Sequence, residues 1–231
     1  MRAKLMKERD LLVPVAMTGV LMAVYLLIRP YGDTPGPTPH PAEQAAAFAS
    51  SWWVAAHVAG ALALAGFGRL ALRLADLTPE LFAARLGRWA GLASVVFVLP
   101  YFGAETFALH VIGRHAETDP SMLTMVTEIR DQPVAITLFG LGLLLLAVSG
   151  IAFAIAWTQY AGSRAAWPLG VLIALVLPQF YLAPVGRMVF GVAYLLAAAL
   201  FAASVLRRNR LTVGPAPDPT APDSMTPSYR R

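Results

Sequence analysis

The chain alternates long apolar runs with short polar segments, and the length of the runs predicts helices that cross a membrane. A helix needs about 20 mostly apolar residues to span a bilayer. Six runs within residues 11–206 follow this pattern, the fifth being the shortest. The predicted fold class is therefore all-α: a polytopic integral membrane bundle of six transmembrane helices, with spans at about 11–28, 51–72, 89–113, 133–157, 167–182 and 186–206.

The segments outside these runs have the composition of termini, loops and helix starts. Residues 1–10 form a basic N-terminus, and we expect the first span to be uncleaved because no small-residue cleavage site follows it. Tyr31–Pro41 is rich in proline and glycine, which predicts a loop. Thr78 before Pro79 is typical of a helix N-cap. Residues 207–231 are polar and proline-rich, which predicts a disordered tail.

Two stretches are predicted to lie at the membrane–water boundary. Trp52 and Trp53 open the second span, where aromatic side chains commonly anchor a helix. At about residues 120–130, apolar side chains recur at helical spacing, which predicts a short amphipathic helix outside the bilayer. This helix is a candidate lid over the third and fourth spans. Those side chains are Met122, Met125, Val126 and Ile129.

The basic residues predict the orientation of the chain. With the N-terminus inside, four of the 18 basic residues fall on the outer side: Arg29, Arg114, Arg130 and Arg187. The other fourteen fall on the inner side: Arg2, Lys4, Lys7, Arg9, Arg69, Arg73, Arg85, Arg88, Arg164, Arg207, Arg208, Arg210, Arg230 and Arg231. Because cytoplasmic loops carry an excess of lysine and arginine, we expect both termini, including the 207–231 tail, to be cytoplasmic.

Composition supports the membrane class and narrows the functions. The chain is 58% hydrophobic and only 13% charged, whereas soluble domains are about a quarter charged. The net charge of +5 is explained by membrane orientation, so no nucleic-acid partner is predicted. Cysteine is absent, which excludes thiolate metal sites and cysteine nucleophiles. The alanine- and arginine-rich, lysine-poor composition resembles that of actinobacterial membrane proteins, which implies a bacterial plasma membrane. For a membrane protein of this class we expect lipids, and other membrane protein subunits, as partners.

Five polar residues within or beside the apolar runs, His57, Glu105, His110, Gln179 and Arg187, all fall in the predicted outer half of the bilayer. A polar group at such depth is costly unless it is paired or meets water, so we predict that these residues converge on one outward-facing pocket. The third span is the most unusual, since its apolar run also holds the helix-distorting Pro100. The predicted pocket residues are Glu105, His57, His110, Arg187, Tyr101 and Gln179.

Helical phase separates these residues further. Tyr101 and Glu105 are four apart and share a face, whereas Glu105 and His110 are five apart and diverge by about 140°. A hydrogen bond between His57 and Glu105 is the preferred single pairing. Each residue also has a structural interpretation: Glu105 as a tie between helices, His110 as an interfacial side chain, and Arg187 as an anchor that reaches the headgroups.

Three functional classes follow from this pattern. The first, which we favour, is a non-enzymatic sensor, scaffold or accessory subunit with no cofactor, because no nucleophile–base pair or acidic metal motif occurs within the spans. The second is an electron-transfer or metal protein that binds haem b through His57 and His110, or a divalent metal through His57, His110 and Glu105. The third is a small proton-coupled transporter in which Glu105 titrates, although no internal repeat supports it.

Overall fold

The computed structural model describes residues 8–33 and 40–212, with side chains described as far as Asn209, and every regular element in this part is helical. Residues 1–7, 34–39 and 213–231 lie outside the described part, and with them most of the predicted N-terminus, loop and tail. The elements are α2 (Leu12–Ile28), α3 (Pro41–Ala49), α4 (Ser51–Leu77), α5 (Phe82–Gly103), η1 (Ala104–Ala108), α6 (Leu109–Ala116), η2 (Pro120–Leu123), α7 (Thr124–Arg130), α8 (Pro133–Ala161), α9 (Trp167–Ala174), α10 (Val176–Gln179) and α11 (Pro184–Thr212).

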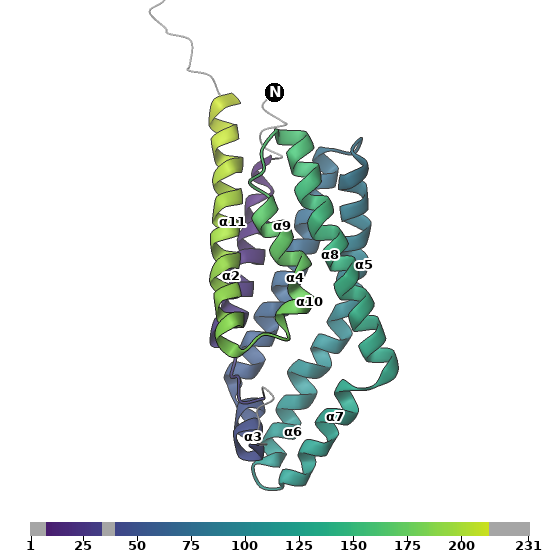
Figure 1. The fold of residues 1–231 in the computed structure, drawn as a ribbon, viewed down its shortest axis with the longest axis vertical. Coiled ribbons are helices and arrows are strands. Elements are labelled where there is room, and N and C mark those ends of the chain that lie inside the picture. The colour runs from purple at the N-terminus through teal and green to yellow at the C-terminus, as the bar shows by residue number, and fades with distance from the viewer. Residues whose placement is uncertain (1–7, 34–39, 213–231) are drawn as a thin grey trace, which may run out of the picture.

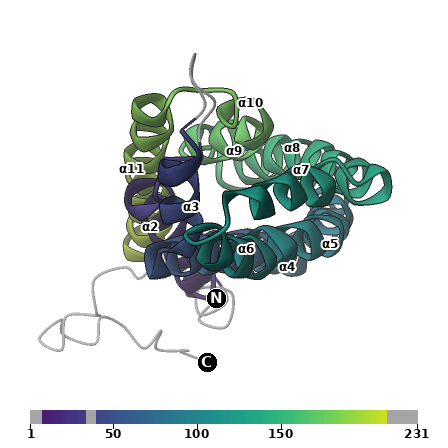
Figure 2. The ribbon, with the colours of Figure 1, turned by 90° about the horizontal axis from the view of Figure 1, so that it is seen from below.

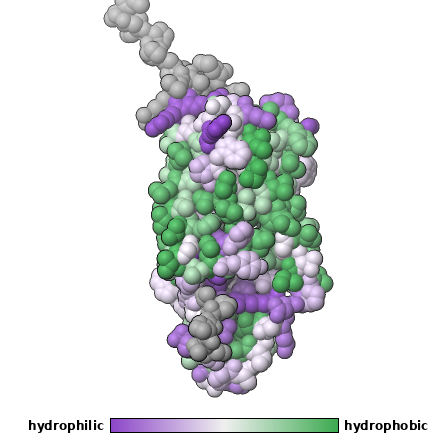
Figure 3. Space-filling model, viewed as in Figure 1, coloured by the Kyte–Doolittle hydropathy of each residue, from purple (hydrophilic) through white to green (hydrophobic). Residues whose placement is uncertain are grey.

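Four helices of the described chain are long and apolar enough to cross a membrane: Ser51–Leu77, Phe82–Ala116, Pro133–Ala161 and Pro184–Asn209. The second of these joins α5, η1 and α6 without a break. Helix α2 is apolar but has 17 residues, and α9 and α10 are shorter still. Figure 3 shows, on the face in view, an apolar belt across the middle of the molecule with polar bands beyond it. The helix class is confirmed, and the belt indicates a membrane-embedded protein.

The helices form one bundle with two different ends (Figures 1 and 2). Helix α2 packs between α4 and α11, and α8 packs between α5 and α9. We call the end where α2 begins and α11 finishes the terminal end, and the end formed by α3, α6, η2 and α7 the cap end. Some crossings depend on small residues. A Cβ atom on Gly150 of α8 would come within 2.6 Å of the Gly170 carbonyl oxygen of α9, so these helices touch backbone to backbone.

Aromatic side chains fill the bundle toward the terminal end. Phe153 of α8 lies 6.0 Å from Phe67 of α4 and 5.1 Å from Phe201 of α11, measured between ring centroids. Trp157 lies 4.7 Å from Phe201. All four rings are buried. Because large rings from three helices meet here, this part of the bundle is a packed core rather than a passage.

The cap end has a second, smaller core. Phe48 of α3, Trp53 of α4, Leu109 and Ile112 of α6 and Val126 of α7 pack together, with Met122, Leu123 and Ile129 against them. The predicted amphipathic segment is thus divided into η2 and α7, and its apolar side packs on the protein's own α3 and α6 rather than on lipid. Met125, predicted to share that apolar side, is 41% exposed.

Trp53 and Thr78 correct two sequence predictions. Trp53, expected at the membrane boundary, is buried in the cap core, whereas Trp52 is 61% exposed. Thr78 does not start a helix: its backbone N–H donates to the Leu74 and Ala75 carbonyls and its hydroxyl donates to Leu74, so it ends α4. The next helix begins four residues later, at Phe82.

The start of the predicted disordered tail is helical, and the residues before α2 are tied to the bundle. Helix α11 continues to Thr212, so residues 207–212 of the predicted disordered tail are helical. Glu8 is buried, and its Oε1 atom accepts hydrogen bonds from the Tyr160 hydroxyl at 2.5 Å and from Arg208 Nε at 3.1 Å. These contacts tie the residue before α2 to α8 and α11.

Candidate functional site

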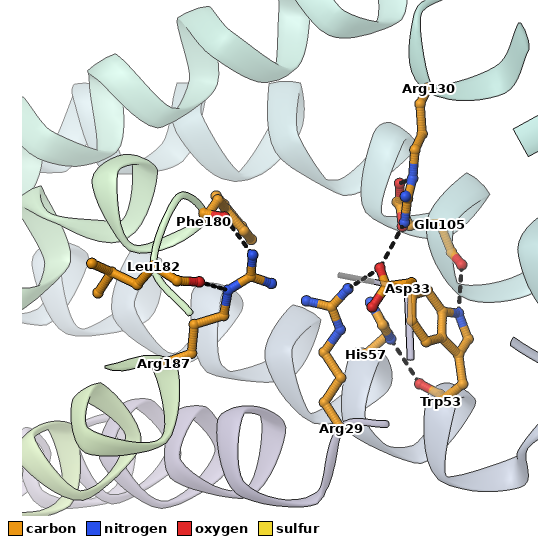
Figure 4. A network of polar contacts seen from close by, with 9 residues as sticks. All are labelled: Arg29, Asp33, Trp53, His57, Glu105, Arg130, Phe180, Leu182 and Arg187. Carbon is orange, nitrogen blue, oxygen red and sulfur yellow. Dashed lines mark hydrogen bonds and ion pairs between the residues drawn. The ribbon is translucent and has the colours of Figure 1, made fainter. Parts of the chain in front are cut away.

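A cavity of about 410 Å³ lies in the bundle on the side of the cap. Seven segments contribute to it: the C-terminal part of α2 with the loop after it, α4, α5 with η1, α7, α8, the α10 region and α11. Its lining residues are Tyr25, Arg29, Asp33, His57, Tyr101, Phe102, Glu105, Arg130, Ile136, Phe139, Gly140, Leu177, Phe180, Tyr181 and Arg187. Figure 4 shows the polar part of this wall.

A π-helical turn positions Glu105. Proline has no backbone N–H to donate, so Pro100 interrupts the hydrogen-bond ladder of α5, and four residues later the helix widens into η1. The buried Trp53 indole N–H donates to the Glu105 backbone carbonyl at 2.8 Å and so links α4 to this turn. Such turns are common at functional sites. The helix is therefore distorted close to Pro100, at the acidic residue of the third apolar run.

An ion network connects the bundle to the cap. Arg130 of α7 donates from Nε and Nη2 to the two carboxylate oxygens of Glu105, at 2.6 and 2.9 Å. Arg130 also contacts the Asp33 carboxylate at 3.1 Å, and Arg29 contacts the same oxygen at 2.6 Å. The side chains of Arg29 and Asp33 are each 5% exposed and that of Glu105 is 12% exposed. Such bidentate, charge-assisted contacts in a shielded site are strong and well oriented.

The charge of Arg130 is maintained by this network. Burial alone would lower the pKa of its guanidinium, but the hydrogen bonds and negative charges of Glu105 and Asp33 outweigh burial and raise that pKa above its ordinary value. Arg130 therefore stays cationic at any pH at which the protein is folded.

His57 lies in the cavity wall but does not pair with Glu105. Its Nδ1 atom shares a hydrogen bond with the Trp53 carbonyl at 2.7 Å. Its ring lies 4.1 Å from the Trp53 ring, 5.3 Å from Tyr25 and 5.6 Å from Phe102, between centroids. The predicted hydrogen bond between His57 and Glu105 is therefore wrong: the Glu105 carboxylate accepts from Arg130, and the His57 ring bonds to the Trp53 carbonyl.

His110 is placed away from the cavity. Its Nδ1 atom shares a hydrogen bond of 2.9 Å with the Phe48 carbonyl, which joins α6 to α3 in the cap. His57 and His110 thus face different surroundings, and His57 is the histidine among the described cavity residues. Within residues 8–33 and 40–212, no three histidine, aspartate or glutamate side chains gather closely enough to hold a metal ion. The candidate ligand set of His57, His110 and Glu105 is not assembled.

Arg187, Tyr101 and Gln179 have three different environments. Arg187 is buried in the cavity wall and donates to the Leu182 carbonyl at 2.9 Å and the Phe180 carbonyl at 2.5 Å. Tyr101 lines the cavity, and its ring stacks on Phe139 at 4.3 Å. Gln179 is buried outside the lining, and its side-chain amide has no hydrogen-bond partner among the described residues. Four of the six predicted residues, Glu105, His57, Tyr101 and Arg187, therefore line one cavity.

Comparison with known proteins does not place the chain. No family model, curated protein or solved structure matches it. Its function must therefore be inferred from the geometry of the cavity.

Sequence reasoning missed three charged members of the site: Arg29, Asp33 and Arg130. A signal for two of them was present in the count of basic residues. Of the four arginines assigned to the outer side, three line this cavity and only Arg114 does not. Three of the four arginines predicted on the side with few basic residues are thus gathered at one site by the fold.

Proposed function

We propose that the protein is a six-span plasma-membrane protein with both termini in the cytoplasm. The four long helices would form four of the six spans, and α2 and the α9–α10 pair would form the other two. The uneven distribution of basic residues supports this orientation, because the terminal end then faces the cytoplasm and the cap end faces outward. The short fifth crossing is supported by packing of α9 against α8 and α11.

We further propose that it acts as a non-enzymatic receptor, either a sensor or an accessory subunit, that binds a small ligand in the outward-facing cavity. The observation that carries this proposal is the cavity itself, with charged and aromatic side chains from seven segments around about 410 Å³. Tyr181, which is 84% exposed, and Ile136, which is 45% exposed, bring the wall to the molecular surface. A concave site with apolar walls and a few polar groups is typical of small-molecule binding.

Two features favour a receptor over a carrier or an enzyme. The aromatic core of Phe67, Phe153, Trp157 and Phe201 fills the bundle between the cavity and the terminal end, whereas a carrier needs polar groups along a path to both sides. The described cavity wall contains no serine, threonine or cysteine that could act as a nucleophile.

The orientation can be tested by labelling, because the chain contains no cysteine. Glu117→Cys places a thiol at the exposed C-terminus of α6, and Arg164→Cys places one in the exposed turn after α8. In intact cells a membrane-impermeant maleimide should label the first variant, and should label the second only after the cells are permeabilised. The reverse result would overturn the orientation, and labelling of both in intact cells would overturn the six-span arrangement.

Access to the cavity can be tested at Gly140. This residue lines the cavity, and an added Cβ atom would have no neighbour within 4 Å. The thiol of Gly140→Cys should therefore react with a small impermeant reagent added from outside. A thiol that reacts only in unfolded protein would refute an outward-facing binding cavity.

A further inference from the structure

The charges around the cavity do not balance. Three cations, Arg29, Arg130 and Arg187, and two anions, Asp33 and Glu105, line it. Arg130 binds both carboxylates and Arg29 binds Asp33. Residues 34–39, which follow Asp33 in the chain, include no aspartate or glutamate. Arg187 donates to two neutral carbonyl oxygens and forms no ion pair with any carboxylate of the described residues. One buried positive charge is therefore left over, and it belongs to Arg187.

Arg187 and Arg29 are held close to the same aromatic ring. Their guanidinium carbons lie 5.8 and 5.5 Å from the centroid of the Tyr31 ring. Figure 4 shows the two guanidinium groups pointing toward one another, Arg187 from α11 and Arg29 from the end of α2. The ring offsets part of the cost of gathering two cations, but a neutral ring does not cancel their mutual repulsion. Burial raises the pKa of Tyr31 to about 12, so its phenol stays neutral and supplies no anion.

We propose that an oxyanion, a carboxylate or a phosphate, binds between Arg187 and Arg29. This inference rests on the proposed function, since it assumes that the cavity accepts a ligand from outside. Guanidinium groups match the oxygens of carboxylates and phosphates and keep their charge in a shielded site. Arg29 uses its Nη2 atom for Asp33, and Arg187 uses Nε and Nη2 for the turn after α10, so each is oriented before a ligand arrives.

The rest of the wall indicates that the anion carries an apolar body. Phe102, Ile136, Phe139, Leu177 and Phe180 line the same cavity as the arginines. A small inorganic anion would leave these side chains in contact with water, whereas an acyl or aromatic group would cover them. The ligand class is thus an amphiphilic anion, whose source is either the headgroup region of an anionic lipid or a soluble organic acid.

Charge selectivity can be measured at the cavity thiol. Gly140→Cys in intact cells would be treated with the anionic reagent 2-sulfonatoethyl methanethiosulfonate and with the cationic reagent 2-(trimethylammonium)ethyl methanethiosulfonate. Each rate would be divided by the rate at the exposed Glu117→Cys. We expect the normalised ratio of the anionic to the cationic reaction rate to be about ten. Adding Arg187→Gln should lower this ratio toward one. Adding Arg114→Gln, which changes an arginine outside the cavity, should leave the ratio unchanged.

The outcomes separate the two proposals. If neither reagent reaches the thiol, the outward-facing cavity and the proposed function fail. If both reagents react and the normalised ratio is one, or if Arg187→Gln leaves a high ratio unchanged, the cavity stands and the anion site is refuted.

A second measurement needs only the unmodified chain, so it stays decisive if Arg187→Gln does not fold. Thermal unfolding of the full chain in neutral detergent would be followed with hexyl phosphate, hexanol or hexylamine at equal concentrations. Hexyl phosphate should raise the midpoint by several degrees and the other two should not. Equal stabilisation by hexanol would show an apolar pocket without an anion site, and no stabilisation by hexyl phosphate would overturn the proposal.

The source of the anion follows from a matched pair of nanodiscs. In discs of phosphatidylcholine alone, hexyl phosphate should stabilise the protein if the site takes a soluble acid. If the natural occupant is a lipid headgroup, discs containing phosphatidylglycerol should stabilise the protein and should abolish the effect of hexyl phosphate. Lipid stabilisation that Arg114→Gln removes and Arg187→Gln does not would refute the assigned site.

Discussion

The pair formed by Glu105 and Arg130 ties the bundle to the cap through two short hydrogen bonds, and its loss should be measurable. Glu105→Gln keeps the shape of the side chain but removes its negative charge. In the unmodified chain the Glu105 carboxylate accepts two hydrogen bonds, at 2.6 and 2.9 Å, from the Arg130 side chain, which is 27% exposed. The amide would keep one acceptor oxygen, and its NH₂ group would face the other donor of Arg130.

The expected magnitude follows from burial and from the remaining partner. Breaking a fully buried ion pair costs about 3–5 kcal/mol. Here Arg130 retains Asp33 at 3.1 Å and part of its guanidinium reaches water, so we expect a loss of about 2 kcal/mol in the free energy of unfolding. For a chain of 231 residues this corresponds to a fall of about 4–8 °C in the unfolding midpoint.

The assay is thermal unfolding of the purified protein in mild detergent, followed by tryptophan fluorescence. The matched control is Asp76→Asn, which removes exposed ion pairs with Arg88 at 3.3 Å and Arg73 at 3.8 Å and should shift the midpoint by less than about 2 °C. Leu144→Ala on the lipid-facing side of α8, 56% exposed, should also cost less than Glu105→Gln. If Glu105→Gln unfolds at the temperature of the unmodified chain, Arg130 does not hold the cap through Glu105.

Two further predictions follow from close contacts. Trp53→Phe should cost about 1–2 kcal/mol and increase hydrogen exchange in η1, because the Glu105 backbone carbonyl loses the indole donor at 2.8 Å; unchanged exchange there would contradict the role of this bond. Gly150→Ala should lower the unfolding midpoint clearly more than Gly140→Ala. The methyl group added at Gly150 would come within 2.6 Å of the Gly170 carbonyl oxygen, whereas one added at Gly140 has no neighbour within 4 Å. Equal midpoints would show that α8 and α9 are not in backbone contact.

The helix class and the approximate positions of the helices could be read from the sequence because hydropathy is a local property. The run at 11–28 corresponds to α2, Leu12–Ile28, since solvent preference and helical hydrogen bonds depend on residues close in the chain. Local rules also marked Pro100 as a residue able to distort its helix, but they did not predict a π turn at Glu105. The same rules misplaced Thr78, whose hydroxyl bonds backward to α4 rather than forward.

Only the tertiary structure decided which polar groups meet. Depth along each span brought His57 and Glu105 to similar levels, but Glu105 pairs with Arg130, 25 positions away in a segment to which hydropathy assigns no depth. Asp33 and Arg130 are 97 positions apart. Helical phase says which face of its own helix a residue occupies; it does not say how neighbouring helices are rotated and displaced relative to one another, because that depends on packing over the whole bundle. The sequence therefore determined a helical protein with apolar runs long enough to cross a membrane, and the packing decided that three arginines and one histidine, rather than two histidines, line its cavity.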